Sequence, residues 1–154
     1  MHKLIISIFL MLVVFSIPVI AQTNIQPVNP DNISTNSIIK HHIIIQLTSS
    51  DTAAWKGLMN NLKHLKDEWG TSVQIEVVAH GPGIEMLMNT KTTQQIKIAE
   101  LKNTGVVFAA CMNTIKARNL TKEAILSEAI FVQSGVVEVV MKQEEGWSYL
   151  KTGF

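Results

Sequence analysis

The chain contains one cysteine, Cys111, whose position makes it the first candidate for chemistry. It follows the apolar run Val106 to Ala110 and precedes Met112 to Ala117, which has the composition of a short helix. A thiol at a helix start faces unpaired backbone N–H groups and the positive end of the helix dipole, and both favour the nucleophilic thiolate. Cysteine is also among the most buried residue types, so the same position fits a thiol that only packs beneath the helix.

Two further loops are expected to lie near Cys111. His80-Gly81-Pro82-Gly83 follows a predicted strand, and Ser134-Gly135 follows another. In a parallel sheet, the loops after the carboxyl ends of the strands gather at one edge, where ligands bind. His80 can act there as an acid, a base or a ligand, or its ring can pack at the strand end beside a tight glycine turn. The candidate catalytic residue is therefore Cys111, and the candidate supporting residues are His80, Asn113, Thr114, Arg118 and Ser134.

Other common kinds of site are not indicated. The turn at His80 lacks the Lys-Ser/Thr pair of a phosphate-binding loop. No spacing of Cys and His matches a metal site, no segment resembles the nucleophile elbow of a serine hydrolase, and no cofactor is expected. A single cysteine also excludes a Cys-x-x-Cys dithiol exchanger. Lys116 and Arg118 can add positive potential near Cys111 or form part of a solvated helix face.

Residues 1–21 have the features of a cleavable secretory signal peptide. Lys3 precedes an apolar run from Leu4 to Ile20, and the run ends in short residues before a cut after Ala21. An uncleaved anchor is the alternative, since the run is at the lower limit for a bilayer-spanning helix. Cleavage predicts a secreted or periplasmic protein without stable membrane insertion. Residues 22–37, rich in Asn, Thr, Ser and Pro, predict a flexible leader.

Residues 38–154 are enough for one domain with its own core. The chain has 13 Lys and Arg residues against 12 Asp and Glu, and Lys3 is lost with the signal peptide, so the mature protein is formally neutral. This balance argues against nucleic acid or an anionic membrane as partner, because both bind through excess positive charge. In an oxidising compartment, a lone thiol is a candidate for reaction or intermolecular pairing.

Strands and helices are expected to alternate along this domain. Gly70 is expected to end the first helix, Ser49 or Ser50 to cap it, and Val136 to Glu145 to be helical from the order of elements despite its strand propensity. The pattern predicts a three-layer α/β/α sandwich with a mostly parallel sheet of about five strands. The expected strands are His42 to Leu47, Val73 to Ala79, Val106 to Ala110, Ala129 to Val132 and Trp147 to Lys151. The apolar stripe of the first helix comprises Trp55, Leu58, Met59, Leu62, Leu65 and Trp69, and that of the next helix, beginning at Thr92 or Thr93, comprises Ile96, Ile98 and Leu101. Shorter helical stretches are expected at Ile84 to Met88, Met112 to Ala117 and Thr121 to Leu126.

Four motifs in this order resemble the DsrE/DsrF-like family, particularly its exported single-domain members. They are Val77-Val78-Ala79-His80-Gly81-Pro82-Gly83, then Gly105-Val106-Val107-Phe108-Ala109-Ala110-Cys111 with Lys116-Ala117-Arg118-Asn119-Leu120, then Ser134-Gly135-Val136, and last Gln143-Glu144-Glu145-Gly146-Trp147-Ser148-Tyr149. The resemblance implies a three-layer α/β/α fold, trimeric or hexameric homo-oligomers, and a cysteine that carries sulfur as a persulfide between partner proteins. Cys111 matches that cysteine. Asn119 stands where relatives often have Gly, and Asn tolerates a left-handed backbone.

Two functions follow as hypotheses. In the first, the chain is a sulfurtransferase-like sulfur carrier: the Cys111 thiolate attacks the outer sulfur of a donor persulfide or of thiosulfate and yields it to an acceptor thiol. Its partners would be donor and acceptor proteins or small sulfane compounds. In the second, the chain is a non-catalytic oligomeric module that binds a small ligand or a protein, with Cys111 packed at the crevice floor.

Overall fold

The computed structural model describes residues 39–152, so the predicted signal peptide over 1–21 and leader over 22–37 lie outside the described residues. The described strands form one sheet in the order β4-β3-β2-β1-β5, and every neighbouring pair is parallel. This arrangement confirms the predicted α/β fold. The strands are β1 (His41–Leu47), β2 (Val73–Ala79), β3 (Val106–Cys111), β4 (Ile130–Val132) and β5 (Ser148–Thr152).

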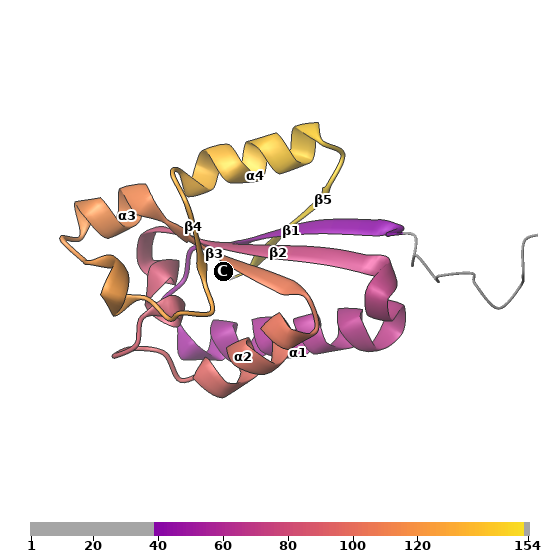
Figure 1. Cartoon of the computed structure of the whole chain (residues 1–154), viewed down its shortest axis with the longest axis horizontal. Coiled ribbons are helices and arrows are strands. Elements are labelled where there is room, and N and C mark those ends of the chain that lie inside the picture. Colours follow the sequence, from indigo (N-terminus) through magenta and orange to yellow (C-terminus); the bar gives the residue numbers. More distant parts are fainter. Residues whose placement is uncertain (1–38, 153–154) are drawn as a thin grey trace, which may run out of the picture. The chain divides into compact units, whose positions relative to one another are not determined.

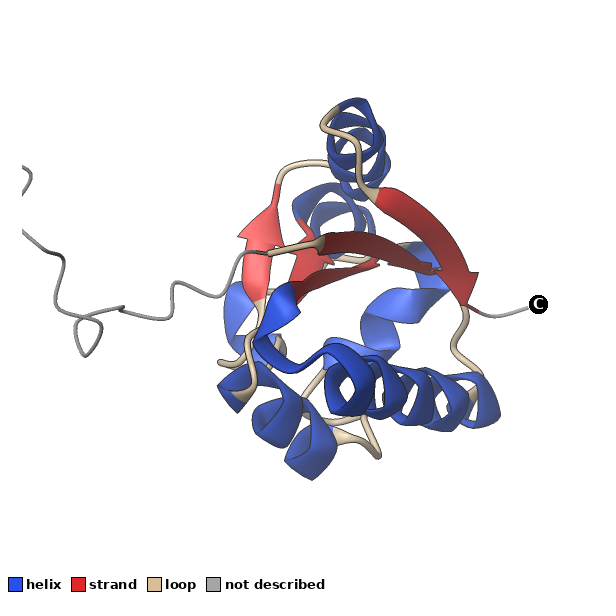
Figure 2. Cartoon of the chain, turned by 90° about the vertical axis from the view of Figure 1, so that its right-hand side faces the viewer, coloured by secondary structure: helices blue, strands red, loops and turns tan. Residues whose placement is uncertain are grey.

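Helices cover both faces of the sheet, as Figures 1 and 2 show. α1 and α2 lie on the lower face in Figure 1, whereas α4 lies on the upper face. The chain adds β2, β3 and β4 in turn on one side of β1 and then returns to place β5 on the other side. Because crossovers between parallel strands are right-handed, this reversal puts α4 on the opposite face. The helices are α1 (Thr52–Trp69), α2 (Gln95–Asn103), α3 (Met112–Ala117) and α4 (Gly135–Glu144), with 3-10 turns η2 (Gly70–Ser72), η3 (Gly81–Leu87) and η4 (Lys122–Ala124).

The main core lies between the lower face of the sheet and α1. Alternate residues of β1, β2 and β3 point to this side, as the two-residue period of a strand requires. α1 contributes its apolar stripe at three- and four-residue steps, and the indole N–H of Trp55 donates to the backbone oxygen of Ser49 at 2.8 Å. Fully buried members of this core include Ile45, Leu47, Trp55, Leu58, Leu62, Val77 and Phe108.

The upper layer is thinner and consists mainly of one helix over the sheet. Its apolar cluster comprises Ile44, Val78, Ala109, Val139 and Trp147. Glu76 of β2 is also buried, with 6 % of its surface exposed, and its Oε1 has no hydrogen-bond partner among the described residues. The pKa of Glu76 is raised to about 7, chiefly by burial and further by the nearby carboxylates of Glu138 and Glu145, against the lowering effect of Lys142.

Several local predictions are wrong in detail. The cap of α1 is Asp51, whose carboxylate accepts from the N–H of Ala53 at 2.8 Å, and not Ser49 or Ser50. An aspartate already at the N-cap position satisfies the free N–H groups of the first turn. Ile96 is 76 % exposed and not part of the α2 stripe. Ile98 and Leu101 share one helix face three residues apart, and Ile96 lies on the other side.

Other element limits also differ from expectation. The segment after β2 is a 3-10 turn that starts at Gly81, earlier than the expected Ile84. The region expected to be helical from Thr121 to Leu126 contains only η4, because Ile125 has left helical geometry and leads toward β4. Cys111 is the last residue of β3 and not the first residue after it.

Among residues 39–152, no helix combines the length and hydropathy needed to cross a membrane.

Candidate functional site

A cavity of about 500 Å³ lies at the carboxyl edge of the sheet, where β2, β3 and β4 lead into η3, α3 and α4. The structure brings all six sequence-predicted site residues to its walls: Cys111, His80, Asn113, Thr114, Arg118 and Ser134. Gly81, Pro82, Ala117, Gly135 and Val136 complete the lining. Loops that are far apart in the sequence meet here because parallel strands place their carboxyl ends along one edge.

Cys111 lies between the starts of two helices. It ends β3 and is the N-cap residue of α3, while the first residue of α4, Gly135, donates its backbone N–H to Cys111 Sγ at 3.2 Å. The cysteine is buried, with 4 % of its surface exposed. The sequence predicts that the helix after Cys111 stabilises the thiolate, but it gives no sign that α4 also supplies a hydrogen-bond donor.

Thr114 connects Cys111 to the turn after β2. Its Oγ1 accepts from the backbone N–H of Gly81 at 2.9 Å, and its hydroxyl proton remains available to donate to the sulfur. Burial on its own raises the pKa of the Cys111 thiol. Hydrogen bonds from the Thr114 side chain, then from backbone groups of Gly135, Thr114 and Asn113, outweigh burial and place the pKa of this thiol below its ordinary value.

Gly135 is required by the close approach of α4 to the sheet. A Cβ atom at this position would lie 3.0 Å from His80 Cβ, 3.0 Å from Val78 Cγ1 and 3.3 Å from Cys111 Cβ. The missing side chain therefore lets the first N–H of α4 reach the sulfur. The same geometry shows that His80 and Cys111 flank one point under the helix start.

The other predicted residues make different contacts. Arg118 forms an ion pair with Glu85 at 2.6 Å, so its charge is compensated within the protein. Asn113 Oδ1 accepts from the Gln133 side-chain amide at 3.3 Å. Ser134 precedes α4 and makes no side-chain capping bond. Lys116 is not part of the cavity lining. The low thiol pKa thus depends on hydrogen bonds and not on the positive side chains that the sequence suggested.

His80 has a partner that sequence reasoning missed. Its Nε2 lies 2.7 Å from the side-chain nitrogen of Gln46, and the side-chain oxygen of Gln46 is hydrogen-bonded to the hydroxyl of Tyr149. Burial lowers the pKa of His80, so the ring is neutral near pH 7. One signal for Gln46 is present in the sequence, since it is the single polar residue in the apolar run Ile43 to Leu47. Tyr149 carries no comparable signal.

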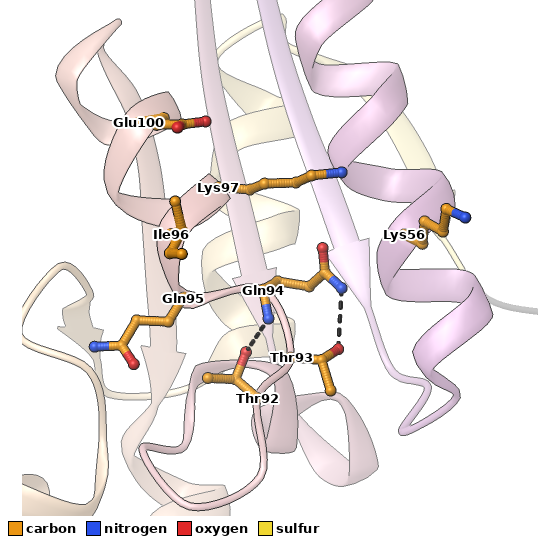
Figure 3. Close-up of a pocket in the computed structure, with 8 residues that line it drawn as sticks. All are labelled: Lys56, Thr92, Thr93, Gln94, Gln95, Ile96, Lys97 and Glu100. Atoms are coloured by element: carbon orange, nitrogen blue, oxygen red, sulfur yellow. Dashed lines mark hydrogen bonds between the residues drawn. The ribbon is translucent and has the colours of Figure 1, made fainter.

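A second hollow, of about 660 Å³, lies at the start of α2 (Figure 3). Its polar groups stabilise the local fold. Thr92 Oγ1 accepts from the N–H of Gln94 at 3.1 Å, and the Gln94 side-chain amide donates to Thr93 at 3.0 Å, as the dashed lines show. It contains neither cysteine nor histidine. Within residues 39–152, no group of three or more His, Cys, Asp or Glu side chains could hold a metal ion.

Comparison with known proteins gives matches across the whole described domain. The family model of the DsrE/DsrF-like family matches residues 41–152. A solved protein of unknown function from Methanobacterium thermoautotrophicum is 31 % identical, with a TM-score of 0.68 over 72 % of this chain and 98 % of that chain. A conserved protein of unknown function from Bacteroides thetaiotaomicron shares the fold at 18 % identity, with a TM-score of 0.59 over 71 % of this chain and 93 % of that one. No curated protein matches the chain.

Proposed function

The chain belongs to the DsrE/DsrF-like family, and from this premise we propose that it is a sulfur carrier that holds sulfane sulfur on Cys111. The observation that carries the proposal is the set of donors around one sulfur atom. Gly135 donates its backbone N–H to Sγ, and the hydroxyl of Thr114 lowers the pKa of the thiol. These donors stabilise negative charge on the sulfur, which is the form that attacks another sulfur atom.

Loading is a substitution at sulfur. The Cys111 thiolate forms a bond to the outer sulfur of a donor persulfide, R–S–SH, and the donor S–S bond breaks. Its electron pair leaves with the donor as R–S⁻, and Cys111 becomes Cys–S–SH. Loss of the persulfide proton to solvent gives Cys–S–S⁻, with the negative charge on the outer sulfur. With thiosulfate as donor, the leaving group is sulfite.

Unloading repeats the same step in the other direction. An acceptor thiolate attacks the outer sulfur of the Cys111 persulfide, forms R′–S–SH, and releases the Cys111 thiolate. The chain has no second cysteine that could form an internal disulfide with the loaded residue. The sulfur therefore leaves to an external acceptor, either a protein thiol or a small thiol.

The site of action proposed here is outside the cytosol, in the periplasm or the extracellular medium. Support comes from the signal-peptide pattern over residues 1–21. N-terminal sequencing of the exported protein is expected to begin at Gln22 in the soluble fraction. Recovery of the uncleaved chain in the membrane pellet would instead show that the segment is an anchor.

Intact mass measurement tests sulfur carriage directly. The protein is incubated with a sulfane donor such as thiosulfate or a small persulfide and separated from excess reagent. Its mass is then measured by native mass spectrometry. Wild type is expected to gain one sulfur atom, and Cys111→Ser none. The proposal would be contradicted if wild type gained no sulfur under conditions in which the same donor loads an unrelated persulfide carrier.

A second candidate function is favoured by the burial of Cys111. A thiol with 4 % of its surface exposed can serve as a packing residue at the floor of the cavity. The chain would then be an oligomeric module that binds a small ligand or a protein without chemistry. Failure of small alkylating reagents to modify Cys111 in the folded protein would leave this function as the better one.

A further inference from the structure

Three side chains, two from neighbouring strands and one from the residue after a third strand, form a continuous hydrogen-bonded row on the face covered by α4. Tyr149 comes from β5, Gln46 from β1, and His80 directly follows β2. Gln46 is opposite Val78 on one side and Lys151 on the other. His80 and Tyr149 are thus its diagonal neighbours, two residues along each strand, which is within reach of long side chains on one face.

The chemistry of the amide fixes the direction of these hydrogen bonds. The side-chain oxygen of Gln46 only accepts hydrogen bonds, and its side-chain nitrogen only donates them. Tyr149 donates its hydroxyl proton to that oxygen, which turns the nitrogen toward His80. Nε2 of His80 must then be the acceptor, so the single proton of the neutral ring is on Nδ1.

The remaining ring nitrogen has no hydrogen-bond partner among residues 39–152, and His80 lines the same cavity as Cys111. The two residues are close neighbours, since their Cβ atoms lie 3.0 and 3.3 Å from the position that a Cβ on Gly135 would occupy. The other ionisable groups around His80 are Cys111 itself, Arg118 with its partner Glu85, and Tyr149 from β5. An Nδ1–H on His80 can donate a hydrogen bond to an anion bound in this cavity next to Cys111.

We propose that Gln46 and Tyr149 are positioning residues that keep the proton of neutral His80 on Nδ1, so that His80 acts in the cavity as a hydrogen-bond donor and not as a general base. A base would need a free lone pair, and the amide of Gln46 occupies the one on Nε2. The donor would stabilise the persulfide anion or the leaving thiolate. The inference rests on the proposed function for its chemical role, but the protonation pattern of the ring can be measured independently.

Ring nitrogen chemical shifts in NMR spectra report which nitrogen carries the proton. The resonances of His80 are identified by their loss in His80→Asn. Wild type is expected to show the Nδ1–H form. Gln46→Glu replaces the donor by a carboxylate, which only accepts, so this variant is expected to carry the proton on Nε2 and to titrate at a higher pH. Tyr149→Phe removes the hydroxyl that orients the Gln46 amide, so this variant is expected to show a mixture of the Nδ1–H and Nε2–H forms of His80. An Nε2–H ring in wild type, or the same ring state in all three proteins, would overturn the proposal.

Sulfur loading of Cys111 separates this inference from the proposed function. At a pH above the His80 titration of the variant, where its ring is neutral, Gln46→Glu is expected to load about tenfold more slowly than wild type, and Tyr149→Phe a few-fold more slowly. Gln95→Glu adds the same charge on the exposed start of α2 and is the matched control. Unchanged loading in both variants would overturn the role of the row while sulfur carriage stands. An Nδ1–H ring in a wild type that takes up no sulfur would overturn the proposed function and the donor role, but not the ring assignment.

Discussion

The ionisation of Cys111 depends on a few hydrogen bonds. Arg118 is paired with Glu85, and Lys116 is not part of the cavity, so positive side chains are not the main source of stabilisation. The donors belong to Thr114, Gly135 and Asn113, and burial opposes them. Because hydrogen bonds to a charged atom are stronger than those between neutral groups, removing one donor should be measurable.

Thr114→Val removes one such donor while keeping the shape of the side chain. The pKa of Cys111 is expected to rise, since the thiolate loses the Thr114 hydroxyl while burial still disfavours charge. Alkylation by iodoacetamide at pH 7 should slow roughly three- to tenfold. Thr114→Ser keeps the hydroxyl and is the control. Equal rates for Val and wild type would show that Thr114 does not stabilise the thiolate.

Glu76 predicts how the free energy of unfolding varies with pH. In the folded protein its pKa is raised from 4.5 to about 7, chiefly by burial, so the folded state holds a proton that the unfolded state has lost. The unfolding free energy should therefore fall as pH rises from about 4.5 to 7, by about 2 to 3 kcal/mol, and change little above that. Glu76→Gln cannot ionise and should lose this dependence.

Urea unfolding at pH 5 and pH 8 measures the effect. Glu144→Gln, an exposed carboxylate on α4, is the control and should behave as wild type. Wild type that is as stable at pH 8 as at pH 5 would mean that Glu76 ionises normally in the fold.

At the scale of elements, glycine positions determine how closely segments approach. Gly83 in η3 lies against the end of β1, and a Cβ there would be 2.2 Å from the backbone oxygen of Leu47. Gly57 in α1 has open space around its Cα and lies in the middle of a helix, where glycine is unfavourable. The same substitution is therefore expected to have opposite effects at the two sites.

Gly83→Ala should lower the free energy of unfolding by about 3 kcal/mol or more, because backbone cannot yield as a flexible side chain does. Gly57→Ala should raise it by about 0.5 to 1 kcal/mol. Chemical denaturation of both variants measures the difference. Similar small changes at the two positions would contradict the close packing of η3 on β1.

The order of elements is readable from the sequence because each has a local pattern. A β-branched run predicts β1, and apolar residues at three- and four-residue steps predict α1. The helix α4 is predicted because strands and helices alternate along the chain. The assembly of the cavity from the ends of three strands is also predictable, since it depends on the parallel sheet. Asn119 adopts φ +52°, the left-handed conformation that the family resemblance indicated.

The contacts that set the chemistry are not readable in this way. The N–H of Gly135 reaches Cys111 only because α4 crosses to the opposite face, which depends on strand order. The contact between Gln46 and His80 joins residues 34 apart in the sequence, and that between Tyr149 and Gln46 joins residues 103 apart. Such pairs depend on strand order and register, which the continuous apolar run of a strand buried on both faces does not indicate.

For the whole molecule, the outward face of α4 predicts self-association. Val136, Val137, Val140 and Met141 are exposed on this helix, with Val137 54 % exposed, and Ile130 and Phe131 are exposed on β4. Grouped apolar side chains of this kind are typical of surfaces that bind another protein. Together with the family membership, they support the proposal of a homo-oligomer of three or six copies.

Light scattering of the mature protein at micromolar concentration is expected to give a trimeric or hexameric mass. Val137→Asp with Val140→Asp should shift the mass toward the monomer without loss of helix content, because both side chains point away from the sheet. Ile96→Asp changes an isolated exposed apolar residue on α2 and should leave the mass unchanged. A monomeric wild type would rule out this assembly.

For the sulfur carrier proposed above, the depth of Cys111 has a consequence for how an acceptor distinguishes the loaded from the empty protein. An S–S bond is about 2 Å long, so a persulfide extends the reactive atom by that distance from Sγ toward the cavity opening. The empty thiol, with 4 % of the residue exposed, stays beneath the start of α4. An acceptor whose thiol penetrates only part of the cavity would touch the terminal sulfur of the loaded form and miss the empty one. Recognition of cargo then needs no conformational change, because the length of one covalent bond distinguishes the two states.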